Sequence, residues 1–454
     1  MKFIIVGAGE VGFHIASRLS KEDKDVVVVD NNPENLRRIA ENIDVQTIHG
    51  SGSSPTVLEE AGIKDTSIFL AVTNSDETNL VSCMFANILS PATTKLVRLR
   101  NEEYVNYIER YAKDLLRIKM VINPEVEVVK TIDRLMTIPG AVDIGEFADG
   151  RVKLIGIRVD EDCPVKGIKL FEFKTKFCVD GILVAAIVRE ESLIIPSGSD
   201  QIIPGDIVYF VAEEKRLPDA LKCFGKHMQP IRRVLIVGGG NVGFRLASLL
   251  EERSVHTKLI EKDRDRCNFL AEHLNNVIIL QGDGSDQELL QEENIQDMDV
   301  VITLTGDEET NILTSLLAKR MGAMKTVTRI NKLSYFPIMD AIGIEHVVSP
   351  RLSAINTILQ HIRRGKILSA ISIKGEEAEV LEAVALETSD IVGAPLKKIR
   401  FPKGVLVVAI LRDKEVIIPT GDSVIHPNDH FIIFSTRESI TEVEKALMVK
   451  LEYF

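Results

Sequence analysis

Residues 3–13 read FIIVGAGEVGF, in which four apolar residues lead into the glycine pattern G-x-G-x-x-G. An amphipathic stretch, Val11–Leu19, follows, so the pattern lies between a predicted strand and a predicted helix. In this setting the first glycine makes a tight turn, the second lets a pyrophosphate approach the backbone, and the third lets helix and strand pack closely. N–H groups at the start of the helix would then hold the phosphate. The stretch therefore predicts a Rossmann-like nucleotide site.

Such a site needs an acidic residue at the end of the second strand, about twenty residues on, to bind the ribose hydroxyls. Asp30 closes the predicted strand Val26–Val29 and follows Gly12 by 30 − 12 = 18 residues. Because a carboxylate there repels a 2′-phosphate, we expect NAD(H) or an adenosine phosphate (ATP or ADP) as ligand, and not NADP. The competing interpretation is that the glycines serve packing alone and no phosphate binds.

The whole pattern occurs twice. Gly7–Phe13 returns as Gly238–Phe244, at an offset of 238 − 7 = 231 residues, and Asp30 falls on Glu261 at the same offset. Further pairs are Thr73–Asn79 with Thr305–Asn311, Arg98 with Arg329, Gly181–Ile187 with Gly404–Ile410, and Ile195–Gly198 with Ile418–Gly421. This self-similarity indicates the duplication of a unit of roughly 225 residues.

Each unit has two parts. The first alternates short apolar runs with helical patterns, which predicts a parallel sheet with helices on both faces. After Ile138–Gly140, short β-branched runs separated by turns predict a small α+β lobe, and the second unit changes in the same way near Arg363–Gly365. In the first half the expected strands and helices are Phe3–Val6, Pro33–Asn42, Val45–Ile48, Ile68–Val72, Glu77–Leu89 and Leu96–Val97, besides those already named.

The predicted fold class is therefore α/β, with two tandem repeats, each a Rossmann-like doubly wound parallel sheet followed by a small α+β C-lobe. The expected domains are 1–138 and 230–365 for the nucleotide-binding lobes, and 139–225 and 366–454 for the C-lobes.

Candidate nucleotide-binding residues follow from these positions. The fourth strand ends at the sheet edge where ligands lie in such folds, and Arg98 closes the fifth strand, where it either contacts phosphate or is simply solvated. The loop Gly50–Ser53, like its counterpart Gly282–Ser285, either borders the adenine or is a β-to-α turn with an N-cap serine. Ser51 replaces Asp283, which suggests unlike ligand preferences. Asp76, Glu77, Glu308 and Glu309 are interpreted as stabilising helix dipoles. The candidates are Gly7, Ala8, Gly9, Glu10, Val11, Asp30, Thr73, Asn74, Arg98, Gly238, Gly239, Gly240, Asn241, Val242, Glu261, Gly282, Asp283, Thr305, Gly306 and Arg329.

Composition excludes several other classes. The 454 residues carry a formal net charge of −12 and no block of five basic residues, which disfavours nucleic acid and anionic lipid as partners. No apolar stretch approaches the length of a membrane span, and the start of the chain lacks the pattern of a signal peptide, so we expect a cytoplasmic protein. The five cysteines form no C-x-x-C pair, which fits a reducing compartment and argues against a zinc site.

Motifs typical of common enzyme classes are absent from the sequence. The sequence contains no G-x-S-x-G, no H-E-x-x-H and no G-x-x-x-x-G-K-[ST], and no cluster of acid, base and nucleophile marks the small lobes. We therefore expect a binding protein and not an enzyme. An NAD-dependent oxidoreductase is the alternative, and a scaffold with vestigial loops is the third hypothesis.

With these residues assembled, the chain resembles tandem RCK (regulator of K⁺ conductance) units over essentially its whole length, as in the peripheral subunits of bacterial Trk potassium uptake systems. The resemblance rests on Gly7–Gly12 with Asp30, the helix start Asp76–Asn79, Arg98, and Ile195–Gly198 before Pro204–Asp206, each with a counterpart in the second half. Ser51 departs from the aspartate that such units often carry.

The resemblance implies that NAD(H) or ATP/ADP binds without turnover, as a regulatory ligand. It also implies a homo-oligomer, typically a tetrameric ring, docked at the inner face of the cell membrane on a potassium-translocating subunit. Ligands that favour one ring conformation would bias the gate of that partner.

Overall fold

The computed structural model describes residues 2–177, 181–190, 192–227, 230–332, 335–344, 346–362, 367–373, 377–387, 389, 391–413, 415–440 and 442–443. They form two compact units. One comprises Met1–Ile132 with Ile231–Ile362, and the other comprises Asp133–Pro230 with Arg363–Phe454. The first unit holds both Rossmann-like lobes and the second holds both small lobes. The predicted switch at Arg363–Gly365 lies outside the described residues.

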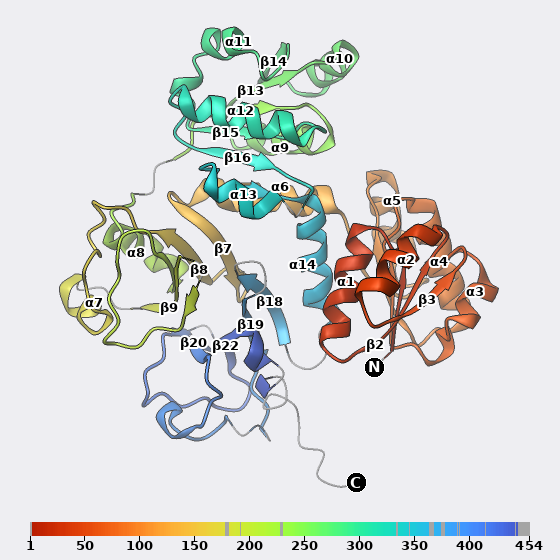
Figure 1. Ribbon diagram of the computed structural model, residues 1–454, viewed down its shortest axis with the longest axis horizontal. Coiled ribbons are helices and arrows are strands. Elements are labelled where there is room, and N and C mark those ends of the chain that lie inside the picture. Colours follow the sequence, from red (N-terminus) through yellow and green to blue (C-terminus); the bar gives the residue numbers. More distant parts are fainter. Residues whose placement is uncertain are drawn as a thin grey trace. The chain divides into compact units, whose positions relative to one another are not determined.

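Each Rossmann-like lobe is built on a six-stranded sheet whose pairs are all parallel (Figure 1). The strand orders are β3-β2-β1-β4-β5-β6 and β14-β13-β12-β15-β16-β17, so the order reverses beside β1 and beside β12. Ligands of open α/β sheets bind at such a reversal, outside the carboxyl ends of the strands. The strands are β1 (Lys2–Val6), β2 (Asp25–Asp30), β3 (Gln46–His49), β4 (Ile68–Ala71), β5 (Thr94–Arg98), β6 (Ile118–Ile122), β12 (Arg233–Val237), β13 (His256–Glu261), β14 (Val277–Gln281), β15 (Val300–Thr303), β16 (Thr326–Arg329) and β17 (Val347–Val348).

Helices connect these strands, as the alternation of the sequence predicts. The central strands are runs of β-branched and aromatic residues that are buried on both faces, as a sheet covered by helices on two sides requires. The helices are α1 (Glu10–Lys21), α2 (Pro33–Asn42), α3 (Pro55–Glu60), α4 (Asp76–Leu89), α5 (Glu102–Tyr107), α6 (Pro124–Thr137), α9 (Asn241–Glu252), α10 (Arg264–His273), α11 (Gln287–Glu292), α12 (Glu308–Arg320), α13 (Phe336–Ala341) and α14 (Pro350–Ile362).

The sequence-based limits hold to within a few residues for the five expected strands of the first half. Helix α2 has the predicted bounds, because Asn32 caps its start by accepting a hydrogen bond from the Glu34 N–H and Pro33 occupies the first turn. Strand β4 ends one residue earlier than predicted, so Thr73 and Asn74 lie in the following loop. Strand β6 was not predicted, since Lys119 interrupts its short apolar run.

The two small lobes share one antiparallel topology. Their five-stranded sheets have the equivalent orders β10-β9-β11-β8-β7 and β21-β20-β22-β19-β18, which confirms the duplication at the level of the fold. One buried cluster combines side chains of both sheets, among them Tyr209 and Phe434, so the sheets share a core. The elements are β7 (Ala141–Phe147), β8 (Val152–Arg158), α7 (Leu170–Phe177), β9 (Ile182–Arg189), β10 (Ser192–Ile194), β11 (Ile207–Glu213), α8 (Leu217–Cys223), β18 (Ile367–Ile373), β19 (Ala378–Val384), β20 (Val405–Arg412), β21 (Glu415–Ile417) and β22 (His430–Thr436).

The turn Pro204–Asp206 is explained by an ion pair between a buried aspartate and a partly exposed arginine. Asp206 is 1% exposed and accepts two hydrogen bonds of 2.9 Å from the Arg189 guanidinium, while its carboxylate also receives the Ile203 N–H. Asp429 and Arg412 repeat the arrangement in the second lobe, at 3.1 and 2.7 Å. A bidentate guanidinium satisfies the carboxylate that the turn buries, so the repeated motif has a structural role.

Four cysteines, Cys83, Cys163, Cys223 and Cys267, are buried free thiols, and Cys178 lies outside the described residues. Among the helices that the structure describes, none combines the length and apolar character that a membrane span requires.

His346 makes the second Rossmann-like lobe sensitive to acid. Its side chain is 5% exposed, and burial, with Lys325 and Lys319 nearby, lowers its pKa to about 3. The unfolded chain binds this proton near the ordinary pKa of about 6.5, so stability is lost as pH falls below that value. Between pH 7.5 and pH 5 we expect a loss of roughly 2 kcal/mol from this group.

The measurement is urea unfolding of wild type and His346→Gln at both pH values. Glutamine does not titrate, so the variant should lose about 2 kcal/mol less than wild type over this interval. Parallel losses in both proteins would show that His346 is not buried in its neutral form.

Candidate functional site

The three glycines of the first phosphate loop have different reasons to be glycine. Gly7 has φ +111°, and a Cβ there would lie 2.9 Å from the Thr73 nitrogen. A Cβ on Gly12 would overlap the carbonyl oxygen of Gly7, so the fold itself excludes a side chain at both positions. Gly9 has an ordinary φ of −67°, and a Cβ there would meet nothing within 4 Å. The fold does not require glycine at position 9, whereas a phosphate approaching the backbone would.

The second loop repeats this pattern. Gly238 has φ +108° with Thr305 against it, and a Cβ on Gly243 would overlap Gly238, while a Cβ on Gly240 would meet nothing within 4 Å. In both halves, therefore, the glycine at the start of a long helix, α1 or α9, has empty space at its Cβ position. Free N–H groups at this helix start favour an anion.

The two acidic candidates hold the glycine loops. The Asp30 carboxylate accepts hydrogen bonds from the N–H of Ala8 at 2.5 Å and of Asn32 at 2.7 Å. In the second half Glu261 accepts from Gly239 at 2.7 Å and from the N–H of Asp263. Each carboxylate thus joins the end of the second strand to the middle of the loop, and it reaches the sheet edge where the sequence places it.

Asn79 fixes the next loop, although the sequence pattern gave it no role. Its buried side chain, 0% exposed, accepts from the Thr73 N–H at 2.9 Å and the Thr73 hydroxyl at 2.7 Å. Its amide donates to the carbonyls of Thr73 and Arg98, at 3.2 and 2.9 Å. Asn311 makes the same four bonds to Thr305 and Arg329. One asparagine per lobe therefore joins two strand ends below the ligand position.

Arg98 is a buried cation that the protein satisfies only in part. It is 7% exposed, and its Nη1 donates at 3.4 Å to Val72 and at 3.5 Å to Asn74, while Nε has no partner among the described residues. Burial lowers its pKa to about 10, so it stays charged at neutral pH. Arg329 likewise has an unpartnered Nε, and burial lowers its pKa too. Simple solvation therefore does not describe Arg98, and an anion would complete its hydrogen bonds.

A cavity of about 400 Å³ lies over these groups in the first lobe, within the size range of small-molecule sites. Every first-half candidate except Ala8 lines this cavity, and the Ala8 side chain is buried. Ser51 and Gly52 also border the cavity, and the N-cap position of α3 is occupied by Ser54, whose side chain makes no capping hydrogen bond. The lining candidates are Gly7, Gly9, Glu10, Val11, Asp30, Thr73, Asn74 and Arg98.

Two arginines in this lining were not predicted. Arg100 follows Arg98 by two residues and donates to Asn74 at 3.2 Å. Arg351 belongs to α14 of the second repeat. The alternation of Arg98 and Arg100 along the chain could have suggested the first, whereas no pattern within one repeat could have revealed the second.

The second-half loop 282–285 differs in its chemistry. Asp283 accepts from the Ser285 N–H and hydroxyl at 2.9 and 2.7 Å and from Lys262 at 3.0 Å. The hydrogen bonds from Ser285 are the main cause that lowers its pKa to about 2. Its carboxylate stabilises the turn that begins at Gly282. Because the counterpart of Asp283 is the uncharged Ser51, the two loops differ in charge. Gly306, beside Thr305, has nothing within 4 Å of its Cβ position.

The helix-start acids do more than the predicted dipole stabilisation. Asp76 accepts hydrogen bonds from the N–H groups of Arg100 and Asn101 at 2.9 and 2.8 Å. Glu308 accepts from the Lys332 N–H at 3.2 Å. These carboxylates therefore hold the chain after the fifth strand of each sheet.

Known proteins resemble this chain in sequence and in fold. The TrkA-N domain model matches residues 3–124 and 234–350, and the TrkA-C domain model matches 154–225 and 380–448. Two curated relatives are named Trk system potassium uptake protein TrkA. The relative from Azorhizobium caulinodans is 38% identical and that from Vibrio alginolyticus 37%, each over the full length of both chains.

Among solved structures, the RCK domain of GsuK matches with a TM-score of 0.60 at 16% identity, covering 98% of this chain and 94% of that one. A GsuK channel bound to NAD also has a TM-score of 0.60, and the match covers 98% of this chain and 78% of that chain. Since the family models cover more than half of the chain and the relatives match it from end to end, the chain belongs to the family of Trk system potassium uptake proteins TrkA.

Proposed function

We propose that this chain is the nucleotide-binding regulatory subunit of a potassium uptake system, and that it binds its ligands without converting them. The family supports the potassium system. The observation that carries nucleotide binding is a glycine at a helix start in each repeat, Gly9 or Gly240. The fold has room for a side chain at both positions, yet both are glycine. Both glycines are N-cap residues, a position that also accepts Ser, Thr, Asn or Asp, so we take phosphate approach as the reason that both repeats have glycine there.

The proposed ligands are NAD(H) and ATP or ADP. Carboxylates at Asp30 and Glu261 suit ribose hydroxyls and disfavour a 2′-phosphate, and the buried arginines Arg98 and Arg329 suit phosphate. One fold neighbour, a GsuK channel, is bound to NAD, so this fold holds a dinucleotide in that protein. We propose the twenty candidate residues of the two halves as the ligand-binding set.

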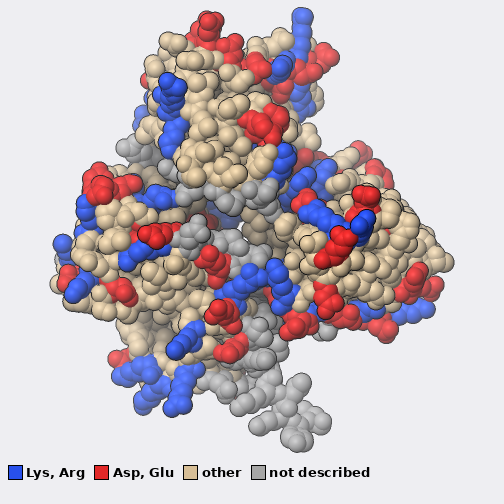
Figure 2. Space-filling view, viewed as in Figure 1, with Lys and Arg blue, Asp and Glu red and all other residues tan. Residues whose placement is uncertain are grey.

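The proposed partner is a Trk-type membrane subunit that translocates potassium, with this chain at the cytoplasmic face as a homo-oligomer, in a tetrameric ring. Acidic and basic side chains are interspersed over the face in Figure 2, which fits a protein partner better than a nucleic acid. The proposed lobes are 1–138, 139–225, 230–365 and 366–454. Ligands would act by binding two ring conformations unequally.

Two measurements test the proposal. Thermal unfolding with NAD, NADH, ATP or ADP should show an upward shift for wild type, reduced in Asp30→Ala or Glu261→Ala according to which half binds the ligand. Potassium flux into vesicles that carry the membrane subunit should then depend on this chain and on the nucleotide. A wild type that no nucleotide stabilises would refute nucleotide binding.

An NAD-dependent oxidoreductase is the second candidate, favoured only by the NAD-type glycine loops. It predicts a substrate-dependent change in absorbance at the nicotinamide band, whereas the regulator predicts none under conditions where binding is saturated.

A further inference from the structure

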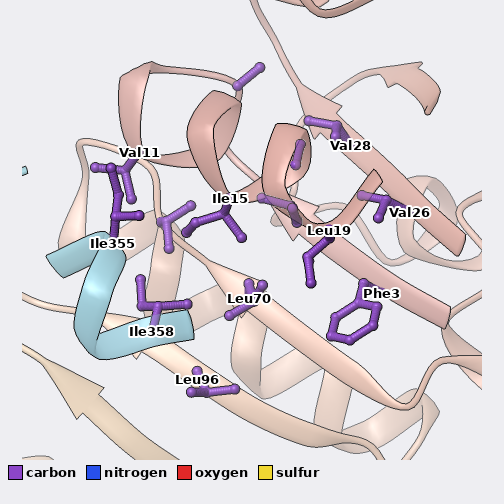
Figure 3. Close-up of a cluster of buried hydrophobic side chains, with 14 of the residues drawn as sticks. Phe3, Val11, Ile15, Leu19, Val26, Val28, Leu70, Leu96, Ile355 and Ile358 are labelled. Atoms are coloured by element: carbon purple, nitrogen blue, oxygen red, sulfur yellow. The ribbon is translucent and has the colours of Figure 1, made fainter. Parts of the chain in front are cut away.

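The first nucleotide pocket is completed by the second repeat. Helix α14 packs against α1, and its buried Ile355 and Ile358 join the cluster of Val11, Ile15 and Leu70 (Figure 3). All these side chains are 0–4% exposed, so the helix is held firmly against the first lobe. This packing brings Arg351, at the start of α14, into the lining of the pocket.

Arg351 adds a third guanidinium to Arg98 and Arg100. Among the described residues, no hydrogen bond or ion pair engages its guanidinium, so it can meet an anion. The nearby carboxylate of Glu10 is already paired with Arg38, whose hydrogen bond is the main cause that lowers the Glu10 pKa. Three arginines around one cavity suit a ligand with several phosphate charges.

At the second site, the first repeat supplies the opposite charge at the equivalent position. Helices α6 and α14 both follow the last strand of their sheet and begin with proline, so Glu125 is the counterpart of Arg351. Glu125 reaches the second glycine loop, where it accepts a hydrogen bond from Asn241 at 3.3 Å and lies 3.6 Å from the Nε of Arg245. The counterpart of Arg100 is the uncharged Asn331.

We propose that Arg351 and Glu125 are specificity-determining residues that act across the repeats. Arg351 makes the first site select nucleoside triphosphates over ligands of lower charge. Glu125 makes the second site discriminate against additional phosphate charge, so that it prefers a ligand with only a pyrophosphate. This inference rests on the proposed nucleotide binding and adds which half takes which class of ligand.

The first arm of the test isolates the first site in a Gly240→Val background. Calorimetric titration with ATP, ADP and AMP at fixed salt should give tighter binding as phosphates are added. Arg351→Gln should weaken ATP about tenfold, the effect expected when one charged hydrogen bond is lost, and should weaken AMP far less. Arg351→Lys, which keeps the charge, should recover most of the ATP affinity.

The second arm isolates the second site in a Gly9→Val background. Glu125→Gln should strengthen ATP relative to AMP there, while Arg351→Gln, whose charge lies in the lining of the first pocket, should change this ratio less. As a control in the first arm, Arg320→Gln removes the same charge at the exposed far end of α12 and should not alter the ratio.

The outcomes separate the two proposals. If neither background binds any nucleotide while both remain folded, nucleotide binding itself fails. Charge selection across the repeats is refuted if nucleotides bind but Arg351→Gln weakens the binding of ATP and AMP equally at the first site. It is also refuted if Glu125→Gln alters the affinity of the second site for neither ATP nor AMP.

Discussion

Replacing Gly9 by valine should leave the chain folded and abolish the stabilisation that nucleotides give through the first site. The backbone there is extended, with ψ −173°, and a Cβ would meet nothing within 4 Å. The change in cap residue at α1 should cost no more than about 1 kcal/mol. A valine side chain would, however, occupy the space through which a phosphate reaches the helix N–H groups.

Thermal unfolding with and without ATP or NAD measures the effect. A ligand at a hundred times its Kd stabilises a single site by about 2.7 kcal/mol, and this gain should disappear for whichever ligand the first site binds. Gly240→Val makes the same test of the second site, and the double variant should respond to no nucleotide. Full ligand stabilisation in the double variant would place nucleotide binding elsewhere.

Gly12→Ala is the matched contrast. Its Cβ would overlap the carbonyl oxygen of Gly7, so we expect a loss of at least about 3 kcal/mol in stability without any ligand. Gly12→Ala would then lose folding stability, whereas Gly9→Val would lose only nucleotide binding at the first site. The contrast separates phosphate approach from helix packing, the two interpretations that the sequence pattern left open.

Local features of the fold were readable from the sequence because their causes are local. The glycine pattern, the apolar strands and the capped helix α2 each depend on residues within a short window, and the duplication supplied an independent second example. The two acids were found for the same reason, since the end of β2 or β13 lies a fixed number of residues beyond the loop.

The missed parts depend on packing between distant segments. Arg351 joins the first pocket only because the apolar face of α14 docks on α1 of the other repeat, and helical periodicity does not reveal which helix covers which. The opposite charges of Arg351 and Glu125 show that the two repeats, alike in fold, are unlike at their edges. Asn79 was visible in the repeat, but its role needed the position of Arg98, nineteen residues further on.

Replacing Asn79 by alanine should destabilise the first lobe by about 4 kcal/mol and also weaken its nucleotide binding. The variant removes four hydrogen bonds from a fully buried position and leaves the Thr73 N–H and the Arg98 carbonyl without their partner. Each unsatisfied buried group costs about 1–3 kcal/mol, and the loop and strand end that present Thr73 and Arg98 to the ligand would lose their common support.

Ser82→Ala is the matched control, because Ser82 is equally buried on the same helix but its hydroxyl donates only to the Thr78 carbonyl one turn earlier. We expect this variant to lose no more than about 1 kcal/mol and to keep its ligand affinity. Urea unfolding measures the first difference, and titration of the folded variants in the Gly240→Val background measures the second. Since Asn311 makes the same bonds in the other repeat, Asn311→Ala should weaken only the second site, measured in the Gly9→Val background. If Asn79→Ala lost no more stability than Ser82→Ala, the four bonds would not hold the strand ends together, and the position of Arg98 would need another cause.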